Sequence, residues 1–86
     1  MPDDAEIPLA ARAAALATAV CGQLKELRLE QGLSIYRLAQ MTGLNERAID
    51  FIEKGERTPT IDTVARIALA LGLSVSEVAG KAENVE

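Results

Sequence analysis

Apolar residues recur at steps of three or four along most of the chain, which is the spacing of a helix with one buried face. In the first long segment they are Leu9, Ala13, Leu16, Val20, Leu24 and Leu27. This pattern predicts one helix over residues 9–30, or two helices broken near Gly22, because an internal glycine costs about 1 kcal/mol relative to alanine. Gly32 is placed to end this segment.

Four shorter helices are predicted from start and stop signals. The predicted N-caps are Ser34, Asn45, Thr60 and Ser74, and Ser74 forms a capping box with Glu77. Gly43, Gly55 and Gly72 are placed to end the first three of these helices. The predicted segments are IYRLAQMT, ERAIDFIEK, IDTVARIALAL and VSEVAG, and no segment alternates as a strand does. The fold class is therefore all-α, a compact bundle of five short helices with an extended N-terminal helix.

The composition narrows the possible functions. The 86 residues form one domain with an aliphatic core, since Tyr36 and Phe51 are the only aromatic residues. With no histidine, one cysteine and no phosphate-binding glycine loop, the sequence offers no nucleophile–base pair and no metal cluster. We expect no enzymatic activity, no metal and no cofactor. Cys21 is interpreted as a small buried apolar residue.

The formal net charge of −4 is concentrated near the two ends of the chain. We predict an acidic flexible tail over residues 1–7, a helical extension over 8–23, a main helical domain over 24–80 and a second flexible tail over 81–86. Residues 24–78 contain seven basic and eight acidic residues, so this core is nearly neutral. The chain has no apolar tract of membrane-spanning length and no signal-peptide pattern, and we expect a cytoplasmic protein with no membrane partner.

The segment from Ile35 to Lys54 has the features of a helix-turn-helix. Ala39 is small enough for two helices to cross closely, and Gly43 tolerates the positive φ of the turn. Apolar residues at suitable positions to hold the second helix against the first are Leu38, Leu44, Ile49 and Ile52.

With LKELRLEQGLS before it and ERTPTIDTVARIALALGLSVSEV after it, this segment resembles the Cro/cI-like (xenobiotic response element) helix-turn-helix family. The resemblance covers about residues 24–79 and implies a lambda-repressor-like DNA-binding domain. It also implies a transcriptional regulator, expected to be a repressor, that reads a palindromic operator as a homodimer through the helix at 45–54.

The resemblance also implies roles for individual residues. The positions that contact base edges in the family are occupied by Glu46, Arg47 and Phe51, with Asp50 beside them. The positions that match or adjoin phosphate contacts are Ser34, Arg37, Asn45, Lys54, Arg57 and Thr58. Arg28 and Glu53 match a structural ion pair. Two residues depart from the family pattern: Ile35 stands where glutamine is usual, and Phe51 replaces a polar reader.

The recognition segment TGLNERAIDFIEKGER holds four acids and three bases, which is unusual for a surface that meets phosphates. If Glu53 pairs with Arg28 inside the protein, its charge is not presented to DNA. The remaining face can still read bases, because a carboxylate accepts from cytosine, arginine binds guanine and phenylalanine contacts the thymine methyl. Specific but modest, salt-sensitive binding is therefore expected.

Several alternatives remain open from the sequence. The same scaffold can serve as a protein-interaction module or an antitoxin-like protein. Glu46 can act as a helix N-terminal acid, and Phe51 can pack on Tyr36 or on the following loop. The N-terminal helix can cover its own bundle or a second copy; we favour the second copy, and so expect a homodimer through this helix. Double-stranded DNA is the expected partner, and no small-molecule effector is expected.

Overall fold

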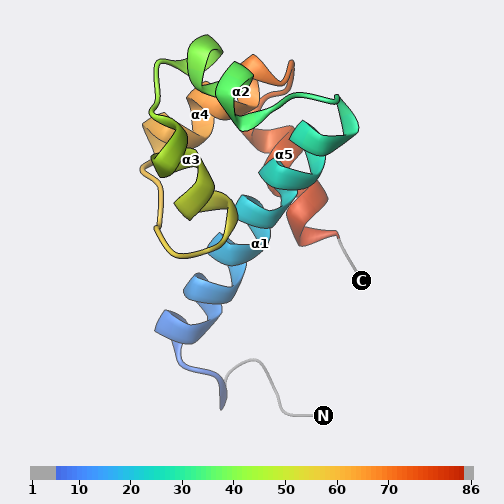
Figure 1. Cartoon of the computed structure of the whole chain (residues 1–86). Helices are drawn as coiled ribbons and strands as arrows, with labels where there is room; N and C mark the ends of the chain where they lie inside the picture. The colour runs from blue at the N-terminus through green and yellow to red at the C-terminus, as the bar shows by residue number, and fades with distance from the viewer. Residues whose placement is uncertain (1–5, 85–86) are drawn as a thin grey trace.

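The computed structural model describes residues 6–84 and contains five α-helices and no strand within that range. They are α1 (Leu9–Glu30), α2 (Ile35–Thr42), α3 (Glu46–Glu53), α4 (Ile61–Ala70) and α5 (Val75–Glu83) (Figure 1). The all-α prediction is confirmed. Most of the predicted N-terminal tail, and the last two residues of the C-terminal one, lie outside the described residues.

The structure decides between the two alternatives for α1, and the ends of three other helices differ from the sequence pattern. α1 is continuous through Gly22, because Cys21 and Leu24 on either side of it are buried and hold the helix in place. No other part of the protein lies within 4 Å of the position of a Cβ atom at Gly22. α3 and α4 each end one residue earlier than expected. α5 continues to Glu83, three residues into the segment expected to be a tail, because the buried Ala82 extends its apolar face.

The core is aliphatic and draws on all five helices. Its buried members are Leu24, Leu27, Leu38, Ile49, Val64, Ile67, Ala68, Leu71 and Val78. α1 packs on α5 and α3, while α2 packs on α3 and α4, so the two motif helices share one core with the rest of the bundle. Cys21 is also buried, and this burial raises the pKa of its thiol. No single helix among residues 6–84 is long and apolar enough to cross a membrane; α4 and α5 reach that length and composition only as a pair bent by 97°.

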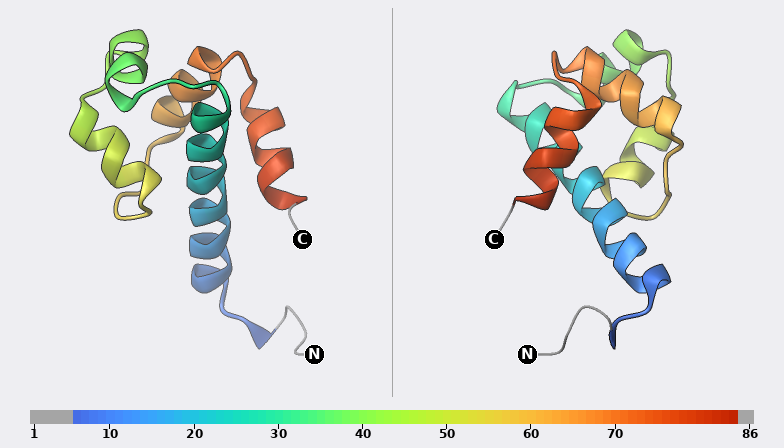
Figure 2. Two further views of the ribbon diagram at one scale, coloured as in Figure 1. Left: turned by 45° about the vertical axis from the view of Figure 1, so that its right-hand side comes forward. Right: turned by 180° about the vertical axis from the view of Figure 1, so that it is seen from behind.

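The first turns of α1 extend beyond the rest of the bundle, as both views in Figure 2 show. This projection makes the molecule elongated, with principal extents of 43 × 21 × 19 Å. Leu24 and Leu27 on the second half of α1 are buried, whereas Leu16 on its first half is 44% exposed and Leu9 is 77% exposed. The apolar stripe of α1 therefore continues past the core that covers it.

Candidate nucleic-acid interface

The turn between α2 and α3 is fixed by side chains on both sides of it. Gly43 has φ 77°, and its backbone N–H donates to the carbonyl of Ala39, which closes α2. The buried Thr42 hydroxyl donates to the carbonyl of Leu38 at 2.8 Å and accepts from the Leu44 N–H at 3.2 Å. A left-handed φ has a low conformational energy only for glycine, so Gly43 and these hydrogen bonds together set the angle between the two helices.

Both motif helices begin at a capping side chain. The Ser34 hydroxyl oxygen accepts from the backbone N–H of Arg37 at 3.0 Å, and the Asn45 amide oxygen accepts from that of Ala48 at 3.0 Å. Each cap satisfies one backbone donor and leaves its own O–H or N–H₂ group available to a phosphate oxygen. Free backbone N–H groups in the first turn and the helix dipole add to the attraction for anions at both helix starts.

Arg28 and Glu53 form a bidentate ion pair between α1 and the end of α3. The Arg28 Nε and Nη2 atoms donate to the two Glu53 carboxylate oxygens at 2.7 and 2.8 Å, and Nη1 donates to the Leu33 carbonyl at 2.7 Å. The side chains are only 9% and 5% exposed. The hydrogen bonds that Arg28 donates to Glu53 raise the pKa of the guanidinium, and burial opposes this rise. Glu53 is therefore turned into the protein and ties α3 to α1.

A second pair lies on the outer face of α3. The Lys54 ammonium lies 2.8 Å from an Asp50 carboxylate oxygen, four residues earlier on the helix. The pKa of Lys54 is raised mainly by its hydrogen bond to Asp50 and, to a smaller extent, by the negative charge of Asp50. Asp50 was interpreted as a base reader and Lys54 as a phosphate contact, but here each satisfies the other. Because the pair is exposed to solvent, breaking it costs little free energy.

Phe51 is half-buried and contacts Arg57. The Arg57 guanidinium carbon lies 5.5 Å from the centroid of the Phe51 ring, within the range of a cation–π contact. Phe51 thus packs against the segment that follows α3, which was one of the two packing alternatives in the sequence. Arg57 itself remains exposed and holds its charge beside the recognition helix.

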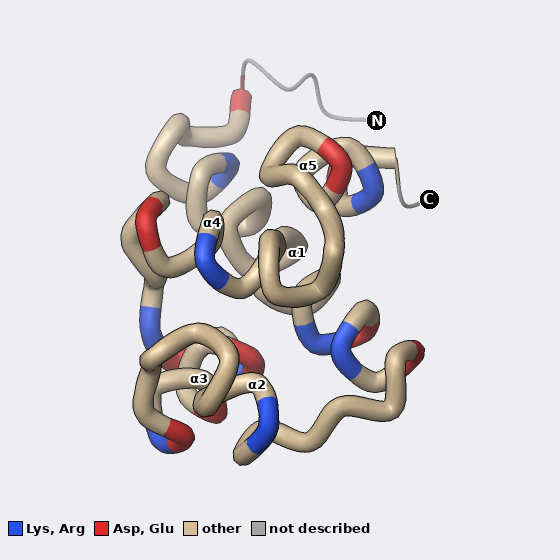
Figure 3. Tube along the Cα trace, turned by 90° about the horizontal axis from the view of Figure 1, so that it is seen from above, with Lys and Arg blue, Asp and Glu red and all other residues tan. Residues whose placement is uncertain are grey.

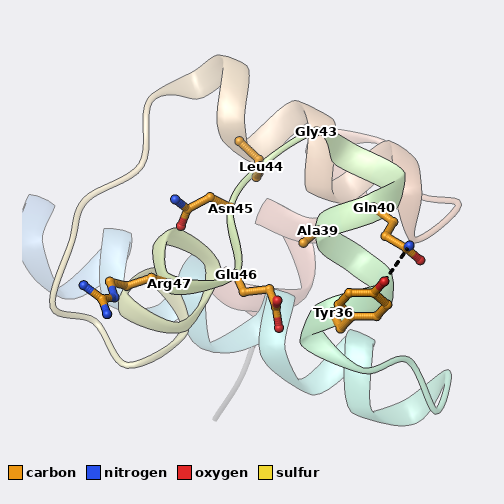
Figure 4. A pocket seen from close by; sticks show the side chains of 8 residues that line it. All are labelled: Tyr36, Ala39, Gln40, Gly43, Leu44, Asn45, Glu46 and Arg47. Atoms are coloured by element: carbon orange, nitrogen blue, oxygen red, sulfur yellow. Dashed lines mark hydrogen bonds between the residues drawn. The ribbon is translucent and has the colours of Figure 1, made fainter.

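An open groove of about 670 Å³ separates the outer faces of α2 and α3. Its walls include Asn45, Glu46 and Arg47 from the recognition side, and Tyr36 and Gln40 from α2 (Figure 4). Gln40 Nε2 donates to the Tyr36 hydroxyl at 3.1 Å. In Figure 4 the Glu46 side chain points toward the Tyr36 side of α3, whereas Arg47 points away from it. Tyr36 and Gln40 were not among the site residues expected from the sequence. The available signal was their four-residue spacing, which places both side chains on the same face of α2.

The charges around α2 and α3 are mixed rather than concentrated, and positions of both signs alternate there (Figure 3). In the segment of four acids and three bases, Glu53 is paired internally and Asp50 is paired with Lys54, which leaves two acids and two bases. The phosphate candidates are all exposed: Ser34, Arg37, Asn45, Lys54, Arg57 and Thr58. They are not all in one place, since Arg57 and Thr58 lie against α1 rather than in the groove.

Two short helices held at a fixed angle by a glycine turn, with an open groove between their outer faces, define a helix-turn-helix protein of the DNA-binding class. The sequence profile of the helix-turn-helix family matches residues 24–78. The chain belongs to this family, in its xenobiotic response element type. The resemblance noted in the sequence is thereby confirmed.

Named relatives share this domain. The chain is 39% identical over 62 residues to the HTH-type transcriptional regulator PuuR of Escherichia coli, which covers 72% of this chain and 34% of the relative. It is 40% identical over 53 residues to the HTH-type transcriptional regulator SutR of the same organism, covering 62% and 30%. The matches thus span about a third of each of these longer regulators.

Solved structures agree with the fold. The clp gene regulator ClgR from Corynebacterium glutamicum superposes with a TM-score of 0.75 at 25% identity, covering 79% of this chain and 72% of that one. An HTH_3 family transcriptional regulator from Vibrio cholerae superposes with a TM-score of 0.73 at 37% identity, covering 79% and 38%. Both likenesses support the same arrangement of helices around the motif.

Proposed function

We propose that this protein is a sequence-specific, cytoplasmic DNA-binding transcriptional regulator, acting as a repressor, that reads a palindromic operator through α3. The observation that carries this proposal is the exposed pair Glu46 and Arg47 at the start of a helix whose inner face is fixed by the core and by the Arg28–Glu53 ion pair. A rigid helix with polar side chains at its first turn is the element that helix-turn-helix proteins place in the major groove.

Each exposed group on α3 has a chemical role in this proposal. Arg47 points away from the α2 side and is suited to donate to guanine O6 and N7 (Figure 4). Glu46 accepts from cytosine N4, and Asp50 does so once Lys54 has moved to a phosphate. The Phe51 ring edge contacts a thymine methyl while Arg57 remains over its face. The remaining phosphate candidates set register and orientation rather than sequence preference.

The experiment that tests this function is selection of bound sequences from a random duplex pool at low and moderate salt. An enriched palindrome is the expected result.

On the enriched duplex, Arg47→Ala should reduce discrimination by about 1–3 kcal/mol at one base position. Arg57→Ala should instead weaken binding to all duplexes alike and lower the slope of log affinity against log salt by about one per site. If both variants bind as the wild type does, the assigned reading face is wrong. If no duplex binds even at low salt, a protein-interaction or antitoxin-like role replaces regulation.

The proposal also includes a homodimer formed through the first half of α1. One short reading helix supplies few base contacts, and a twofold pair places two such helices about 34 Å apart, one turn of the duplex. The apolar stripe that is buried at Leu24 and Leu27 continues as exposed Leu16 and Leu9. Arg12 is the only charged residue from residue 9 to residue 24, so two copies of this surface bring few like charges together.

Replacing Leu9 and Leu16 with aspartate should convert the dimer to a monomer and weaken operator binding much more than tenfold, because the two half-sites then bind independently. Sedimentation or light scattering measures the change in mass. Leu69→Asp is the matched control, since Leu69 is 71% exposed on α4 and is not part of this stripe. A double variant that remains a dimer, or a control that dissociates equally, would show that the interface lies elsewhere.

A further inference from the structure

The first half of α1 lies directly against the segment that links α3 to α4. Gly55, Arg57 and Thr58 of this segment surround a small cavity of about 160 Å³ together with residues of α1 that include Ala14 and Thr18. A Cβ atom added to Gly55 would lie 3.8 Å from Thr18 Cγ2, an ordinary van der Waals distance, so Gly55 faces this side chain. The segment that carries two phosphate candidates is therefore supported by α1.

Arg57 contacts Phe51 and also lines the cavity against α1. The Phe51 ring lies under its guanidinium, and the α1 wall, where Ala14 and Thr18 are small and uncharged, lies beside it. A carboxylate on that wall would compete with DNA phosphates for the same cation, because a neighbouring acid binds arginine through charge-assisted hydrogen bonds. The neutral wall leaves the guanidinium of Arg57 available to an external anion.

The residues of α1 that line this cavity lie before the start of the family profile. The family profile begins at residue 24, whereas Ala14 and Thr18 lie before it. The part of α1 beside the Arg57 segment thus precedes the residues that the family profile matches.

We infer that the first half of α1 is a positioning element for DNA binding, in which Thr18 supports the backbone at Gly55 and Ala14 keeps the wall beside Arg57 small and neutral. This inference rests on the proposed function, because it assigns Arg57 and Thr58 to phosphate contacts. Ala14 and Thr18 do not touch DNA in this arrangement; they act through Arg57.

The test compares Ala14→Glu with Ala15→Glu in the full chain, using the operator duplex and a titration of salt. Both alanines are exposed on α1, so the two variants match in net charge and helix propensity, but only position 14 lines the cavity. Ala14→Glu should capture Arg57 and lower the slope of log affinity against log salt by roughly 0.9 for each subunit bound, the value for one lost phosphate contact. Ala15→Glu should keep the wild-type slope, as should Ala14→Gln, which adds similar bulk without charge.

The same pair of variants in an Arg57→Ala background distinguishes positioning from a general effect on the fold. There Ala14→Glu and Ala15→Glu should have equal slopes, since no guanidinium remains to be captured. Equal slopes already in the wild-type background, or a difference that persists without Arg57, would overturn the inference while DNA binding by α3 stands. Failure of the unmodified protein to bind any duplex at low salt would overturn the proposed function, and this inference with it.

Discussion

Removal of either Arg28 or Glu53 should lower the free energy of unfolding by about 3–5 kcal/mol, because the remaining partner is left charged and buried without its counter-ion. Glu53→Ala leaves the Arg28 guanidinium with the Leu33 carbonyl as its remaining protein acceptor, and Arg28→Ala leaves the Glu53 carboxylate without either of its two donors. Since a small domain is stable by about 5–15 kcal/mol in total, either substitution should remove a large share of that stability.

Denaturant unfolding of the single variants and of Arg28→Met/Glu53→Leu measures this effect. The double variant should be more stable than either single one, because it removes both buried charges and keeps apolar volume at the site. Lys54→Ala is the surface control: its ion pair with Asp50 is exposed, and its loss should change stability far less. Single variants as stable as the wild type would show that this pair does not hold α3 against α1.

Leu38→Ala should destabilise the protein by about 2–5 kcal/mol, the range for a leucine removed from a closely packed core. Leu38 is fully buried in α2 and belongs to the cluster that also contains Ile49 of α3 and Val64 of α4. Its truncation therefore opens a cavity where the two motif helices meet the rest of the bundle. DNA affinity should fall as the folded fraction falls.

The matched control is Met41→Ala in the same helix, because Met41 is 43% exposed and loses fewer core contacts. Thermal and denaturant unfolding compare the two variants, and operator binding measured well below the transition separates loss of fold from loss of the interface. Equal destabilisation by the two substitutions would contradict the assignment of Leu38 to the central core.

Elements with strong local signals were predictable from sequence. The four predicted N-caps each accept a hydrogen bond from the residue three positions on, and the Ser74–Glu77 capping box is present. Such signals depend on neighbours a few residues away, so they are visible in a single sequence. The continuity of α1 through Gly22 was not decided, because the local cost of glycine is outweighed by packing against distant helices.

The candidate site was less predictable for the same reason. That Arg57 lies over Phe51, or that Asp50 is paired with Lys54, depends on side-chain directions that the sequence does not specify. The Arg28–Glu53 pair could be predicted because both residues occupy positions that form an ion pair in the family. Nothing in the sequence near either residue indicates this contact. Contacts made by the first half of α1 lie outside that pattern, and the position of the Arg57 segment on Ala14 and Thr18 required the three-dimensional structure.

Tyr36 is an intrinsic fluorescence probe of this interface. It is the only tyrosine of a chain without tryptophan, it is 59% exposed, and it lies in the α2–α3 groove with its hydroxyl accepting from Gln40. Intrinsic fluorescence of the unlabelled protein therefore comes from one defined position on the surface proposed to meet DNA. Quenching or a change in polarisation on adding a duplex reports occupancy of that groove directly, without a dye that would alter a protein of this size.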